Sequence, residues 1–278
     1  LLTIKNGSTV TTGTSFLGEV GGDLFLNVGT LRLMGGEFGG SLIQSVNGSG
    51  DLDGDGFTDV FGLGKGGNIT IQGTTQGANS AADLVELSGG SGITSGAQSG
   101  SGGGGRISIR ATSLDLKEAS GITSSTSSFG TDLDGDGVLD DLTSGGGDIL
   151  VAVQNLNILP DGSTITSSTV LGDTLAVAGG TVTVEGLDAG SKAGSVLLSG
   201  QSSGIFSFSN GGVPGNLTVT ADTLTIPNGA VINTGSGISG PAGKVGITAD
   251  SVVISAGGQI FSRSSQRDAG QVTITANN

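Results

Sequence analysis

Two short acidic segments hold the residues whose types and spacing are best suited to chemistry in this chain. Both follow the pattern D-x-D-x-D-G-x-x-D, over residues 51–59 and 132–140, and Asp141 extends the second. They carry 9 of the 24 acidic residues, 4 in the first and 5 in the second, a crowding of charge that a bound cation would relieve. Hard oxygen ligands at alternate positions, with a glycine to force the turn, suit Ca²⁺. The predicted ligands are Asp51, Asp53, Asp55, the Phe57 carbonyl and Asp59 in the first segment, and Asp132, Asp134, Asp136, the Val138 carbonyl, Asp140 and, in reserve, Asp141 in the second.

Both segments resemble the calcium loops of EF-hand, dockerin and thrombospondin type 3 proteins. This resemblance implies a cation held by the alternate carboxylates. Position twelve holds Gly62 or Thr143 where an EF-hand has a bidentate glutamate, so another carboxylate would have to complete the shell. The alternative interpretation is a solvated acidic turn without a metal.

The elements that must position these segments come from an internal repeat. Residues 215–221, 243–249 and 270–276 align as a glycine followed by alternating aliphatic residues and an alanine, and similar openings occur earlier, at Gly22, Gly67, Gly105, Gly147 and Gly180. Each full period contains three short strands, for example near residues 217–219, 224–226 and 230–232. A fixed period of this length is typical of solenoid proteins.

Within most strands the apolar residues alternate with Thr, Ser, Asn or a charged residue, which predicts an apolar face in a core and a polar face in water. Stacked periods would then form continuous apolar columns such as Leu217/Val245/Val272 and Val219/Ile247/Ile274. We therefore predict an all-β fold, a single-stranded parallel β-helix (β-solenoid) with three short strands per coil and about eight coils, continuous over residues 1–278. Glycine is expected at the corners, where the chain turns sharply and a Cβ would not fit.

A disordered low-complexity chain and a β-sandwich are the alternative folds. The 34% hydrophobic content and the fixed apolar period argue against disorder. The regular strand spacing and the scarcity of aromatic residues argue against a sandwich. The acidic segments are expected as insertions over residues 46–63 and 128–145, each after a third strand and before the next glycine pair. They should lie on one edge of the rod, where Ca²⁺ would order a long corner.

Composition limits the partners. The formal net charge is −14 and the pI is about 4.1, so nucleic acid and anionic lipid surfaces would repel the chain. No apolar run approaches the roughly 20 residues that span a bilayer, so membrane insertion is not expected. The sequence begins at Leu1 without a leader, and an export signal is expected outside it.

The repeat also resembles a known family. A glycine pair, alternating aliphatic residues, an alanine, a Leu-x-Leu strand and a later Gly-Ile-Thr-Ser stand at residues 104–111, 114–116 and 121–124. They are similar to the filamentous haemagglutinin-like exoproteins of two-partner secretion. The resemblance implies a right-handed β-helix, export through an outer-membrane partner, and an adhesive or architectural role at the bacterial cell surface.

The two ends of the sequence are complementary. Residues 2–13 match residues 224–235 without a gap, so the chain starts at the second strand of a period, and residues 270–278 supply a first strand. We expect one unit of a continuous rod, either as a tandem repeat in a longer chain or as subunits that stack head to tail. The alternative is an arbitrary fragment of a longer protein. The predicted self-assembly residues are Leu2, Ile4, Val10, Val272 and Ile274.

Catalysis is not expected. The sequence contains no His, Tyr or Trp, which removes the usual residues for general-base chemistry and for stacking on sugars. The predicted function is a calcium-stabilised structural segment of a secreted surface filament. An adhesin for host or environmental glycans, a β-helix polysaccharide lyase and an ice-binding solenoid are the alternatives.

Overall fold

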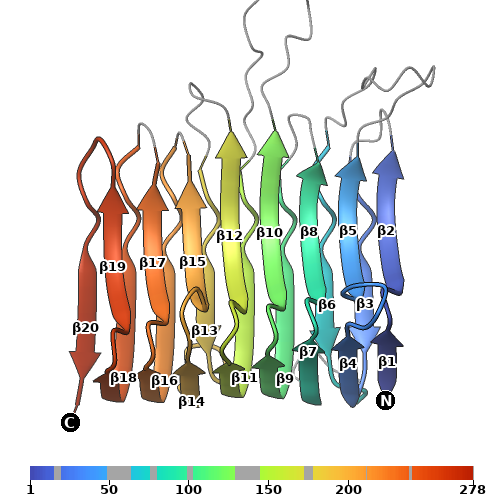
Figure 1. The fold of residues 1–278 in the computed structure, drawn as a ribbon, viewed down its shortest axis with the longest axis horizontal. Coiled ribbons are helices and arrows are strands. Elements are labelled where there is room, and N and C mark those ends of the chain that lie inside the picture. The colour runs from blue at the N-terminus through green and yellow to red at the C-terminus, as the bar shows by residue number, and fades with distance from the viewer. Residues whose placement is uncertain are drawn as a thin grey trace, which may run out of the picture.

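The chain folds into two stacks of parallel strands that run along one axis. The computed structural model describes residues 1–15, 20–48, 64–75, 80–98, 103–128, 145–171, 178–210, 212–237 and 240–277. Within them every paired strand runs parallel to its neighbours, and no helix occurs. The described residues therefore include no helix that could cross a membrane. Figure 1 shows the strands side by side along the long axis, with the chain advancing from one end to the other.

The larger sheet has twelve strands and the smaller has eight. The larger sheet contains β1 (Leu2–Lys5), β3 (Leu24–Asn27), β4 (Thr30–Met34), β6 (Ile69–Gln72), β7 (Ala82–Ser88), β9 (Ile107–Leu116), β11 (Ile149–Ile158), β13 (Val182–Glu185), β14 (Ala193–Leu198), β16 (Leu217–Ile226), β18 (Val245–Ile254) and β20 (Val272–Ala276). The smaller contains β2 (Thr9–Ser15), β5 (Leu42–Gly48), β8 (Gly92–Gln98), β10 (Gly121–Ser128), β12 (Thr164–Leu171), β15 (Gly204–Ser209), β17 (Val231–Ser236) and β19 (Gln259–Ser264). This arrangement is consistent with a β-solenoid, as the repeat predicts.

The strand register stacks the aliphatic residues into columns, and both columns expected from the sequence are confirmed. Leu217 pairs with Val245 and then Val272, and Val219 pairs with Ile247 and then Ile274. A third column, in the smaller sheet, runs through Val10, Ile43, Ile93, Ile122, Ile165, Ile205, Ile232 and Ile260. Residues from both sheets join one buried hydrophobic cluster, so the core lies between the sheets.

One expected corner differs from the prediction. The first and second strands of a period form one continuous ten-residue strand in β9, β11, β16 and β18. In β9 the inward positions end at Ala111 and resume at Leu114, so Thr112 and Ser113 both point outward. The chain therefore bends at two consecutive outward residues, and no glycine is needed there.

Glycine is required at the period openings from Gly67 to Gly270 because neighbouring backbones approach closely. A Cβ on Gly105 would lie 2.3 Å from the Gly67 carbonyl oxygen and 2.6 Å from the Ser95 hydroxyl. A Cβ on Gly147 would lie 2.2 Å from the Gly105 carbonyl oxygen. The glycine pairs thus mark the places where stacked backbones leave no room for a side chain.

The interior of the smaller sheet is partly polar, which corrects the expectation that Ser and Thr face water. Ser45, Ser95, Ser124, Ser167 and Ser207 form an inward column and are fully buried. The Ser124 hydroxyl donates to the Gly105 carbonyl at 2.8 Å and accepts from the Gly147 amide at 3.0 Å. Each such serine satisfies backbone groups that the glycine corners would otherwise leave unpaired.

Candidate functional site

The predicted calcium ligands, within residues 51–59 and 132–141, lie outside the described residues. The strands that precede them are described: β5 ends at Gly48 and β10 ends at Ser128, and only β8 lies between these strands. The segments that follow them resume at Gly64 and Gly145. Among the described residues, no three acidic, His or Cys side chains gather where they could hold a metal ion.

The predicted self-assembly residues lie at opposite ends of the stack. Leu2, Ile4 and Val10 stand on β1 and β2, whereas Val272 and Ile274 stand on β20. Ile4 is 6% exposed, but Val272 and Ile274 are 39% and 44% exposed. The inward aliphatic residues of the last strand therefore lack the cover that the same columns have elsewhere.

The register identifies which residues share a column across the two ends, and the sequence analysis named only part of this set. The column of Leu2 runs through Leu31, Val85, Leu114, Leu156, Val196 and Leu224 to Val252. The column of Val10 ends at Ile260, and that of Val272 begins at Leu24. The same sequence alignment that matched Leu2 to Leu224 could have found Val252, because Leu224 aligns with Val252 one period later.

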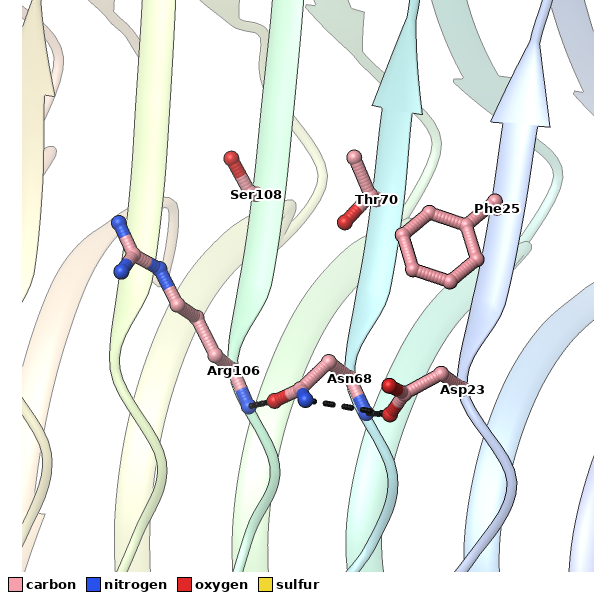
Figure 2. Close-up of a pocket in the computed structure, with 6 residues that line it drawn as sticks. All are labelled: Asp23, Phe25, Asn68, Thr70, Arg106 and Ser108. Atoms are coloured by element: carbon pink, nitrogen blue, oxygen red, sulfur yellow. Dashed lines mark hydrogen bonds between the residues drawn. The ribbon is translucent and has the colours of Figure 1, made fainter. Parts of the chain in front are cut away.

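A polar depression on the outer face of the larger sheet was not predicted from the sequence. Asp23, Phe25, Asn68, Thr70, Arg106 and Ser108 line it, and it has a volume of about 340 Å³. Figure 2 shows these side chains on three neighbouring strands, with the Phe25 ring directed toward Thr70 and the Arg106 side chain extending away from Asn68. Phe25 is 67% exposed, an unusual position for a large aromatic side chain.

Asp and Asn side chains on this face form hydrogen bonds to residues of the next period along the stack. The Asp23 Oδ1 atom accepts from the Asn68 amide at 2.8 Å and from the Asn68 Nδ2 group at 3.1 Å. The Asn68 Oδ1 atom accepts from the Arg106 backbone amide at 3.0 Å. Asp148 Oδ1 accepts from the Thr181 amide in the same way, at 2.8 Å. These bonds fix the carboxylates and the amide in place on the outer surface.

Several cations elsewhere on the surface are paired. Glu86 contacts Arg32 at 3.2 Å and also accepts a hydrogen bond from Lys117, and this bond raises the pKa of Lys117. Asp250 accepts hydrogen bonds from Lys192 and Asn277, which lower the pKa of its carboxyl group. By contrast, within the described part of the chain the Arg106 guanidinium makes no ion pair.

Comparisons with protein-family models, with curated proteins and with solved structures find no match to this chain.

Proposed function

We propose that this chain is a structural segment of a secreted bacterial surface filament, folded as a right-handed β-solenoid with three strands per coil and about eight coils. The observation that carries the proposal is the unbroken parallel register of the apolar columns, from Val10 to Ile260 in the smaller sheet and from Leu24 to Val272 in the larger. Such a column extends by adding strands at either end. A contact of this head-to-tail kind does not close on itself and grows into a fibre.

The end strands support continuation of the rod. Val272 and Ile274 on β20 and the nearby Ile254 are 39% to 44% exposed, although their column neighbours within the stack are fully or almost fully buried. Uncovered parallel edges pair readily with another strand. Further coils of the same polypeptide or a second copy of this chain would supply that strand, placing Leu2 beside Val252 and Leu24 beside Val272.

Calcium is proposed as the cation that orders the two acidic insertions. Because β5 and β10 are separated only by β8, the insertions that follow them would leave the same edge of the rod, about 10 Å apart at two strand spacings. Closing a long corner costs chain entropy, and a bound ion would offset that cost. The carboxylate spacing supports Ca²⁺ over other ions.

The resemblance to two-partner-secretion exoproteins supports export through an outer-membrane partner and a place at the cell surface. The second candidate function, an adhesin for glycans, is favoured by one specific observation, the polar depression that contains Phe25 and Arg106. No comparable observation favours a lyase. An ice-binding face would need a uniform outer ladder, and the row from Phe25 through Thr70, Ser108 and Leu150 is chemically mixed.

Two measurements test the proposal. Oriented samples should give an axial reflection near about 4.8 Å, the spacing of stacked strands along the rod. Sedimentation at rising concentration should show head-to-tail association, which the double substitution V272K/I274K abolishes. T218K, which adds one of the same charges to an outer position on β16, is the control and should associate normally. Absence of the axial reflection would overturn the solenoid, and a monomer at every concentration would overturn stacking between copies.

A further inference from the structure

The depression around Phe25 adjoins a second depression on the same face, and we call the two together the groove. This second depression, of about 230 Å³, is lined by Arg106, Asp148, Leu150, Thr181 and Thr183 among others. Arg106 belongs to both depressions. Together they follow the outer face of the larger sheet from β3 to β13.

The strand register sets the direction of the groove. Phe25 pairs with Thr70, Thr70 with Ser108, Ser108 with Leu150, and Leu150 with Thr183. These residues therefore form a row that crosses five strands at right angles to the strand direction. Four strand spacings make the row roughly 19 Å long. A groove of this length parallel to the rod axis suits an extended polymer better than a compact small molecule.

The groove offers hydrogen-bonding groups that the described protein leaves unused. The hydroxyls of Thr70, Ser108 and Thr183 have no hydrogen-bond partner among the described residues, and neither does the Arg106 guanidinium. Asp23 and Asp148 each use Oδ1 to hold a backbone amide, and their Oδ2 atoms have no partner in the described part of the chain. Planar carboxylate, amide and guanidinium groups can donate to or accept from neighbouring hydroxyls.

Apolar surfaces alternate with these polar groups. The Phe25 ring is 67% exposed at one end of the row, and Leu150 is partly exposed further along it. An exposed aromatic face beside fixed polar groups is a common feature of ligand sites, in which apolar contact supplies affinity and polar groups supply orientation. Such a face can pack against the C–H face of a sugar ring while the ring hydroxyls bond to the polar row.

We propose that this groove binds a linear, neutral, hydroxyl-rich polysaccharide that lies along the rod axis. Neutrality follows from the charges: Asp23 and Asp148 flank the single cation Arg106, and the chain as a whole carries a net charge of −14. An acidic polysaccharide would be repelled by these two aspartates and by the negative net charge of the chain. The inference goes beyond the structural role, because a filament can form whether or not this groove holds a sugar.

Affinity electrophoresis in native gels tests the proposal, with dextran, mannan or hydroxyethylcellulose in the gel and polygalacturonate as the acidic probe. At least one neutral polysaccharide should retard the protein, and polygalacturonate should not. F25A and R106A should each weaken the apparent affinity at least tenfold. Their matched controls are F38A, which removes another exposed phenylalanine, and K244A, which removes an exposed cation outside the groove. Both controls should bind as the parent chain does.

Three results would overturn the inference. These are no retardation by any of the neutral polysaccharides, tighter binding to polygalacturonate, and equal losses in the groove variants and their controls. Circular dichroism and thermal midpoints of all four variants should match those of the parent, because each altered side chain is exposed. None of these results depends on the axial reflection or on association between copies, so the filament proposal is tested separately.

Discussion

Substitution of Ser124 by alanine would probe the buried hydroxyl column directly. Ser124 is 0% exposed, and its hydroxyl joins two periods of the stack through the Gly105 carbonyl, at 2.8 Å, and the Gly147 amide, at 3.0 Å. Alanine removes the hydroxyl and leaves a carbonyl and an amide in the interior without this partner. An unsatisfied buried polar group costs about 1–3 kcal/mol, so for these two groups we expect a loss of about 2–6 kcal/mol.

Urea denaturation measures this loss as a lower midpoint with an unchanged slope. Hydrogen exchange adds a local readout at the Gly147 amide, whose protection should fall about 30-fold if its opening costs about 2 kcal/mol less. Ser125→Ala is the matched control: it lies on the same strand, is only partly buried, and makes no side-chain hydrogen bond to a described residue. We expect a change within about 0.5 kcal/mol for this control. Equal midpoints for Ser124→Ala and the parent, or an equal loss in Ser125→Ala, would refute the reasoning.

Three further predictions concern the corners, the surface charges and the metal. Gly105→Ala should destabilise the fold by about 3 kcal/mol or more in urea denaturation, because its Cβ would lie 2.3 Å from the Gly67 carbonyl oxygen. The control Gly246→Ala should be neutral or stabilising, because its Cβ would meet only the Leu217 carbonyl oxygen at 3.9 Å. Equal effects of the two substitutions would contradict the close-packing argument. Hydrogen bonds from Lys192 and Asn277 lower the pKa of Asp250 below its usual value of 3.8. The stabilisation that these bonds give is therefore present above pH 3.8 and is lost as the pH falls through the lower pKa of the folded state. In a plot of the thermal midpoint against pH, Asp250→Asn should flatten the acid limb, whereas the control Asp222→Asn, at the corresponding corner of β16, should not. Excess chelator should lower the thermal midpoint, because a cation at a hundred times its dissociation constant adds about 2.7 kcal/mol to the free energy of unfolding. The double substitution D53N/D134N should remove this sensitivity to chelator. An unchanged midpoint in chelator would argue against a structural metal.

The repeat in the sequence was sufficient to predict the parallel strands and their register. The aligned positions Leu217, Val245 and Val272 became one buried column because alternation with a period of two defines a face, and a constant repeat places equivalent faces above each other. The prediction failed at Thr112 and Ser113, where two consecutive outward residues bend the chain without glycine. It failed also at Ser124, which lies two residues after the buried Ile122 and so shares its inward face, although a serine was expected to face water.

The amino-acid sequence by itself therefore determined the class of fold, the strand register and the residues of the apolar columns, since these depend on local periodicity. Only the tertiary structure decided what the stacked strands bring together. Phe25, Thr70 and Ser108 each lie three residues after the opening glycine of a period, so the repeat already aligns them, but only the structure shows that this row borders a depression beside Arg106. Ser124 gains its role in the same way, because its partners Gly105 and Gly147 meet it only when successive periods stack.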